Sequence, residues 1–156
     1  MVLAGQAAMV ALLAGWRILG VIENLRFPDV NRLLVGDVMA MRRVRQNPDL
    51  WRMLRGNRIE DARIHRAVFR LIVAVEIVAA LLLAVGATVL ALAAAGAADP
   101  LSARLWALSG VIGWTCIWGG FLVGGQWFHY WLGYEGSQAT HFFMTIWGVA
   151  TFAALT

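Results

Sequence analysis

The sequence predicts an all-α polytopic membrane protein with four transmembrane helices and an amphipathic interfacial helix in the first loop. Hydrophobic residues make up 61% of the 156 residues and charged residues only 14%, whereas soluble domains carry about 25% charged residues. Four apolar runs approach the roughly 20 residues that cross a bilayer, and they cover residues 2–22, 71–97, 105–123 and 139–154. We therefore predict a single domain over 1–156 with spans at 2–25, 60–97, 103–131 and 137–155, and an interfacial loop at 26–58.

The first run is predicted to stay in the protein as a spanning helix. No basic residue precedes it, Trp16-Arg17 lies near its end, and no small-x-small cleavage pattern follows. A removable signal peptide has a basic segment before its apolar run and a small-residue cleavage site after it, so we do not expect one here.

The first loop is predicted to be helical in two segments. Phe27-Pro28 should end the first span and start a new helix, because the residue before a proline disfavours helical geometry. Apolar residues then recur at helical spacing, which is typical of a helix lying on a membrane or on a neighbouring subunit: Val30, Leu33, Leu34, Val38 and Met41. Asn47-Pro48 should cap a second, short helix that Gly56 ends.

Three further signals predict where the later helices begin. Asn57 with Glu60 resembles a capping box and should open the second span from about residue 58. Ser102, after the Asp99-Pro100 turn, is expected to cap the third span. Residues 133–137 contain two glycines and should form the turn into the fourth.

All 13 basic residues are arginine, and 11 of them lie between Arg26 and Arg70, together with only five acidic residues. This excess predicts attraction to anionic lipid headgroups or to an acidic partner surface. A soluble nucleic-acid-binding domain is disfavoured because the loop is short and held between two spans. The residues expected at the interface are Arg42, Arg43, Arg45 and Trp51.

Two spans separate the first loop from the turn at 133–137, so both should lie on the same side of the membrane. We call this end of the bundle the rim. It gathers all three histidines and most of the uncharged polar groups: Glu23, Asn24, His65, Gln126, His129, Glu135, Gln138 and His141.

His129 and His141 flank the last turn and are predicted at similar depth on antiparallel helices. They are the candidate ligands for a haem, a pigment or a metal ion. The favoured interpretation is structural, because histidine among aromatics is common at headgroup depth and no spacing here matches a zinc motif. No cofactor is certain, haem, pigment and quinone stay open, and bound lipids are expected.

Glu76 lies deep in the second span, where a carboxylate costs about 2.5–3.5 kcal/mol by insertion scales. Arg17 in the first span is its natural partner. A structural ion pair that locks two helices is the favoured interpretation, and a proton or ion relay is the alternative.

Glycines in the third span predict close helix packing. Gly120-x-x-x-Gly124 is a spacing that lets helix backbones approach, and with Gly125, Gln126, Trp127 and Trp131 it marks a candidate docking surface. The single cysteine, Cys116, is expected to be a small apolar packing residue.

The chain resembles a bacterial family of predicted small integral membrane proteins of unknown function. The resemblance rests on residues along nearly the whole chain: Asn24, Val38-Met39-Ala40-Met41, Leu50-Trp51-Arg52, Glu76, Gly124-Gly125-Gln126-Trp127-Phe128, Trp131, Gly136 and Gln138. It implies four membrane helices and no particular activity. The family usually has glutamate at the position of Gln126, and its charge pattern implies cytoplasmic termini, whereas the arginines of this chain place the first loop in the cytoplasm.

No nucleophile–base set, phosphate loop or metal-protease motif is present, so we expect a protein that is not an enzyme. The predicted function is a non-catalytic accessory subunit of a larger energy-transducing or redox complex in a bacterial inner membrane. Its expected partners are membrane subunits and lipids, with no nucleic acid and no soluble substrate. One alternative is a haem- or pigment-binding subunit that uses His129 or His141, and the other is a small proton-coupled transporter or channel centred on Arg17 and Glu76.

Overall fold

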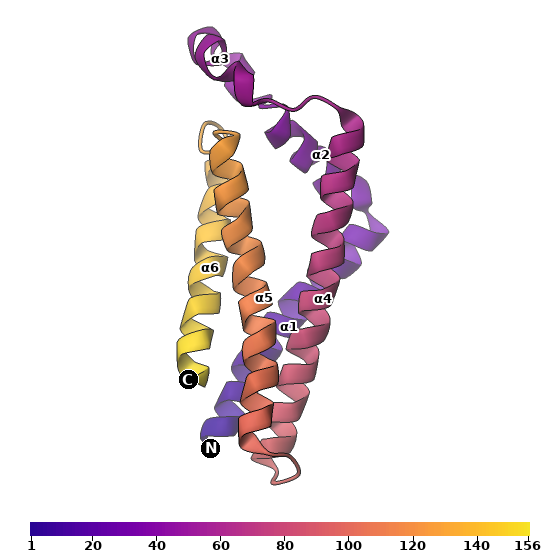
Figure 1. Ribbon diagram of the computed structural model, residues 1–156, viewed down its shortest axis with the longest axis vertical. Coiled ribbons are helices and arrows are strands. Elements are labelled where there is room, and N and C mark those ends of the chain that lie inside the picture. The colour runs from indigo at the N-terminus through magenta and orange to yellow at the C-terminus, as the bar shows by residue number, and fades with distance from the viewer.

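The computed structural model describes all residues 1–156 as four long helices with short helices gathered at one end (Figure 1). No residue forms a strand, which confirms the all-helical class. The α-helices are α1 (Val2–Arg26), α2 (Pro28–Met39), α3 (Pro48–Leu54), α4 (Ala62–Ala94), α5 (Pro100–Trp127) and α6 (Glu135–Leu155). Two 3₁₀ turns, η1 (Val44–Gln46) and η2 (Arg55–Asn57), flank α3.

Three of the long helices, α1, α4 and α5, are long and apolar enough to cross a membrane. The fourth, α6, has 21 residues and falls outside that group by composition. Its first two turns carry Glu135, Gln138 and His141, which lower its apolar content. The protein is therefore an all-helical membrane protein with at least these three candidate spans.

The long helices pack mainly in chain order, with α4 between α1 and α5, and α5 between α4 and α6. Glycines bring α4 and α5 into backbone contact. A Cβ atom on Gly86 would lie 2.6 Å from Ala107 Cα, and one on Gly110 would lie 2.7 Å from Leu83 N. Because those positions lack side chains, the two helices approach as closely as their backbones allow.

The first loop and the turn at 128–134 lie at one end of the bundle, and both termini lie at the other (Figure 1). This arrangement confirms the predicted rim. The Asn57 side chain donates to the Trp127 carbonyl at 2.9 Å, and a Cβ on Gly133 would lie 2.7 Å from Arg43 Cβ. The loop therefore packs directly on the α5–α6 turn.

The loop helices begin where the sequence predicts, but α3 ends differently. Pro28 is the first residue of α2, and the Asn47 side chain accepts hydrogen bonds from the Asp49 and Leu50 amides. Gly56 does not end α3, because the α-helix ends at Leu54 and Gly56 lies inside the following 3₁₀ turn, η2. Tightening of a last turn into 3₁₀ geometry is a common way to satisfy terminal carbonyls.

The residues predicted to cap the second and third spans were wrong. Helix α4 begins at Ala62, where Asp61 accepts from the Arg63 amide at 2.7 Å. Asn57 does not cap it, because Asn57 belongs to η2 and lies five residues before the helix begins. In α5 the cap is Asp99 rather than Ser102, whose amide donates to the Asp99 carboxylate at 2.7 Å.

The apolar stripe predicted on α2 is divided between two environments. Val30, Leu33 and Leu34 are 60%, 57% and 41% exposed. Met41, just beyond the helix, is fully buried. Helix α2 itself packs against α4 at the rim (Figure 1).

Candidate functional site

The most polar part of the interior centres on Arg17 of α1 and Glu76 of α4. Arg17 Nη1 lies 2.6 Å from Glu76 Oε1, and the two side chains are 3% and 8% exposed. The structure therefore brings together the two charges that the sequence paired. Further hydrogen bonds to the buried groups help to offset the cost of removing two charges from water.

Two asparagines extend this pair toward the rim. Asn24 Nδ2 donates to Glu76 Oε2 at 2.7 Å, and Asn31 Nδ2 donates to Asn24 Oδ1 at 2.8 Å. The chain of hydrogen bonds thus runs from α2 to the middle of α4. Asn24 follows Arg17 by seven residues, about two helical turns, and this spacing was the signal that could have placed both on one face. Nothing in the sequence pointed to Asn31.

Two tryptophans of α5 cover the Arg17 guanidinium. Its Cζ lies 4.8 Å from the ring of Trp118 and 5.0 Å from the ring of Trp114, within cation–π distance. The Trp114 indole donates to the Met144 carbonyl at 2.8 Å, which ties the cluster to α6. Three buried nitrogens have no partner in the chain: Arg17 Nε, Arg17 Nη2 and Trp118 Nε1.

The two candidate histidine ligands lie in separate environments. His129 is in the turn after α5 with a φ of 51°, and its Nε2 accepts from Asn57 Nδ2 at 3.3 Å. His141 lies on α6, where its ring packs near Trp118, Phe121 and Tyr130 at centroid distances of 5.4, 5.1 and 5.8 Å. No hydrogen bond or ring contact joins the two imidazoles directly.

The glycines of α5 fall into two groups. Gly119, Gly120 and Gly124 border open space, since a Cβ added to any of them would meet no atom within 4 Å, so they face away from the rest of the chain. Gly125 is different, because a Cβ there would lie 2.5 Å from the Tyr130 ring. It makes room for the protein's own turn and does not belong to an outer surface, which corrects its place in the predicted docking surface.

The other predicted docking residues are exposed. Gln126 lies on the surface at the last turn of α5. Trp127 and Trp131 are 60% and 41% exposed. An outward surface of α5, which we call the glycine face, is formed by Gly119, Gly120, Gly124, Gln126 and Trp127, and Trp131 lies in the turn after this helix.

The four predicted interfacial residues all lie in the rim loop, but only Arg45 and Trp51 contact each other. Arg42 Nε lies 2.8 Å from Asp37 Oδ1, and Arg45 Nη2 lies 2.5 Å from Glu60 Oε1. Arg45 Cζ also lies 4.6 Å from the Trp51 ring. Arg43 instead lies over Tyr134, 5.8 Å from its ring centroid, and so joins the loop to the α5–α6 turn.

Electrostatics at the rim follow from these contacts. The hydrogen bond from Arg45 lowers the pKa of the Glu60 carboxyl below its ordinary value. Burial raises the pKa of the Tyr134 hydroxyl, and the nearby negative charge of Asp37 raises it further. Both groups therefore keep their neutral-pH charge states.

Comparison with known families gives one match that covers nearly the whole chain. The model of the family described as "predicted small integral membrane protein" (DUF2165) matches residues 2–156. No protein of curated function and no solved structure matches the chain.

Proposed function

Because the chain belongs to this family of predicted small integral membrane proteins, we propose that it is a non-catalytic accessory subunit of a larger helical assembly in a bacterial inner membrane. In this proposal α6 is a fourth span and α2 is an interfacial helix. The length of α6 supports the first part, since 21 residues at 1.5 Å per residue extend about 30 Å. The exposed Val30, Leu33 and Leu34 of α2 support the second.

The observation that carries the proposal is the contrast between inward and outward glycines. Gly86, Gly110 and Gly148 all face other helices of the same chain, at positions that a Cβ would overfill. Gly120 and Gly124 lie four residues apart on α5, and a Cβ added to either would meet nothing within 4 Å. Small residues four apart on a membrane helix allow another helix to pack closely, so the glycine face fits a helix from another subunit.

Large apolar side chains at this face are exposed and could contact such a helix. Val123 is 75% exposed and Trp127 is 60% exposed. A helix seated over Gly120 and Gly124 would contact both of them. The energy-transducing or redox class of the assembly stays a prediction from the sequence.

Native mass spectrometry of gently solubilised membranes tests the proposal. We expect the wild-type protein to co-migrate with another membrane subunit, and we expect Gly120→Ile or Gly124→Ile to abolish this association. Gly15→Ile is the matched control, because Gly15 of α1 is also exposed and has no neighbour within 4 Å. A wild-type protein that migrates only as a lone monomer would contradict the proposal, and so would equal loss in the control.

A proton-coupled transporter is a second candidate, favoured by the hydrogen-bonded chain from Asn31 through Asn24 to Glu76 and Arg17. Buried ionisable residues in spans commonly mark ion or proton pathways. In proteoliposomes, Glu76→Gln should abolish proton-driven flux, while Glu23→Gln, at an exposed rim carboxylate, should not. Unchanged flux in Glu76→Gln removes this candidate.

The separate environments of His129 and His141 do not favour a haem or pigment site, and a visible absorption spectrum of the pure protein checks this.

A further inference from the structure

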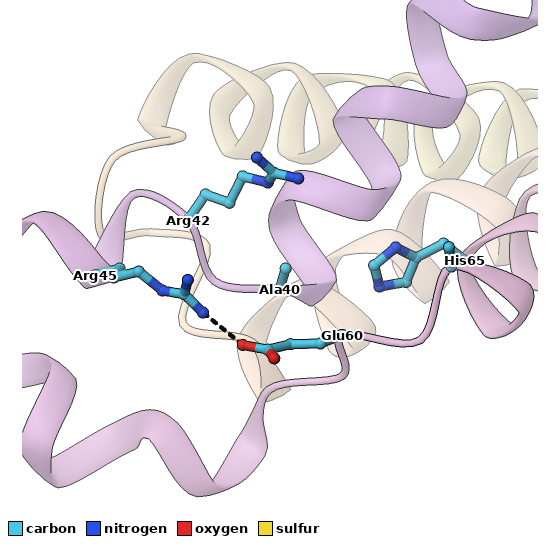
Figure 2. Close-up of a pocket in the computed structure, with 6 residues that line it drawn as sticks. Ala40, Arg42, Arg45, Glu60 and His65 are labelled. Carbon is cyan, nitrogen blue, oxygen red and sulfur yellow. Dashed lines mark hydrogen bonds and ion pairs between the residues drawn. The ribbon is translucent and has the colours of Figure 1, made fainter.

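A cavity of about 280 Å³ opens at the rim, away from both the glycine face and the Arg17–Glu76 pair. It lies between the end of α2, the turn that follows, and the first turn of α4. Figure 2 shows Arg42 and His65 on opposite sides of Ala40, with Arg45 reaching toward Glu60. Its lining residues are Ala40, Arg42, Arg45, Glu60, Ala62 and His65.

The backbone positions two guanidinium groups around this cavity. Met41, which is fully buried, has a φ of 54° and turns the chain sharply after α2. Non-glycine residues seldom adopt this conformation. Because Met41 is anchored in the interior, Arg42 on one side of it and Arg45 beyond it are both held at the cavity.

The opposite side of the cavity is fixed by His65. Its Nε2 donates to the Ile59 carbonyl at 2.7 Å, as assigned from that contact. Its ring lies against Gly36, where a Cβ would be 3.0 Å from His65 Nδ1. The imidazole therefore supports the cavity and is not free to donate into it.

Both arginines keep unused hydrogen-bond donors. A guanidinium has five N–H groups. Arg42 engages Asp37 through Nε, and Arg45 engages Glu60 through Nη2. Their side chains are 68% and 51% exposed, so the remaining N–H groups are accessible for a ligand with several acceptor oxygens.

The charge around the cavity is positive. Glu60 is shared by two guanidinium groups, since Arg58 Nε also lies 3.2 Å from Glu60 Oε1. Among the residues that line the cavity, Arg42 and Arg45 are cationic and Glu60 is the one carboxylate. The whole segment 26–70 has 11 arginines and five acidic residues, which adds to the local positive potential.

The depth of the cavity points to a source for the ligand. Ala62, which lines it, is the first residue of α4, a candidate membrane span. Between Ala62 and the apolar run that starts at Leu71, α4 carries Arg63, Arg66 and Arg70, whose guanidinium groups favour the lipid headgroup region. The cavity therefore lies at the polar end of this candidate span, where headgroup phosphates and free phosphate are both available. Val30 and Leu33 of α2 are exposed at the same end, and side chains of this kind insert among lipid chains.

We propose that the cavity at Arg42 and Arg45 binds a phosphate group, as carried by an anionic phospholipid headgroup or by free inorganic phosphate. Guanidinium groups match phosphate oxygens in charge and geometry. This site is independent of the glycine face, so the two proposals can fail separately.

Native mass spectrometry of the full chain in mixed phosphatidylglycerol–phosphatidylcholine nanodiscs tests the site. We expect retained phosphatidylglycerol, and Arg42→Gln/Arg45→Gln should weaken its binding about tenfold. Arg52→Gln/Arg55→Gln is the matched control, because it removes the same charge from exposed positions outside the cavity. Equal loss in both double variants would overturn the site in favour of non-specific surface attraction.

Two further measurements complete the test. Inorganic phosphate that displaces phosphatidylglycerol supports free phosphate as a ligand, whereas lipid that stays bound supports the headgroup. Glu60→Gln keeps every guanidinium and removes the competing carboxylate, so it should tighten phosphatidylglycerol binding even if the double variant fails to fold. Unchanged or weaker binding in Glu60→Gln would contradict the proposal.

Discussion

Single residues in the interior show how a membrane helix pair accommodates charge. Arg17 and Glu76 neutralise each other at 2.6 Å, Asn24 satisfies the second carboxylate oxygen, and two tryptophans cover the guanidinium faces. Removal of Arg17 or Glu76 alone leaves a buried, unpaired charge, whereas replacement of both by apolar residues leaves an apolar contact. A comparison of the single and double variants therefore shows whether the two charges stabilise the fold as a pair.

We predict that Glu76→Met lowers the free energy of unfolding by about 3–5 kcal/mol, because it strands the Arg17 charge. The double variant Arg17→Met/Glu76→Met should recover most of that loss. Unfolding by SDS titration in bicelles measures both. A single variant no less stable than the double one would show that the charges are not coupled.

At the rim, the exposed Glu60 should titrate below the ordinary pKa of a glutamate because Arg45 donates to it. A carboxyl whose folded pKa is lowered stabilises the fold above the unfolded pKa, and this contribution is lost as pH falls through the folded pKa. The Arg45–Glu60 contact should therefore persist at neutral pH and open in acid. Carboxyl ¹³C NMR of Glu60 measures the midpoint.

The same titration in Arg45→Gln provides the control. Without its main donor, the Glu60 pKa should move back up toward its ordinary value, although Arg58 still contributes. An identical midpoint in both proteins would mean that the Arg45 contact does not form in the membrane-embedded protein.

At the scale of helices, local signals were predictable and tertiary ones were not. Pro28 and Asn47 start helices through neighbours in sequence, and both starts were predicted correctly. Asn57 has an equally good local pattern, but it belongs to η2, and its side-chain nitrogen donates to the Trp127 carbonyl 70 residues away. Sequence spacing cannot show such a long-range contact.

Glycine spacing has the same limit. Gly120-x-x-x-Gly124 is the motif that sequence selects, whereas the chain packs α4 on α5 through Gly86 and Gly110. Which face of α5 meets α4 depends on the whole bundle. A pattern on one helix therefore predicts that close packing is possible without identifying the helix that does it.

Substitutions at these glycines should separate inner from outer packing. Gly110→Ala places a methyl 2.7 Å from Leu83 N and should destabilise the purified protein by about 1–3 kcal/mol through overpacking. Gly113→Ala, one turn along the same helix, meets Ala79 Cβ at 3.4 Å and should change stability by less than about 1 kcal/mol. SDS titration compares them, and equal effects would rule out backbone contact at Gly110.

At the scale of the whole molecule, the rim was the most successful sequence prediction. Counting spans put the first loop and the α5–α6 turn on one side, and the structure joins them through Asn57 and Arg43. Arg17 and Glu76 could also be paired from burial cost alone. Their tryptophan cover could not, because it depends on the position of α5 beside α1.

The orientation of this rim follows from charge. Eleven arginines lie between residues 26 and 70, and Arg104 is the only basic side chain near the opposite turn. Basic residues in short loops stay on the cytoplasmic side. We therefore predict that the rim faces the cytoplasm, in contrast to the cytoplasmic termini that the family resemblance implies.

Single cysteines in a Cys116→Ser background test orientation and the fourth span together. In intact spheroplasts, a membrane-impermeant maleimide should label Ser102→Cys and Thr156→Cys, while Arg52→Cys and Gly136→Cys should react only after lysis. Labelling with the two pairs exchanged would show cytoplasmic termini and favour the family pattern over the local charge. If Thr156→Cys reacts together with Gly136→Cys instead, α6 does not cross the membrane, because a span must place residues at its two ends on opposite sides.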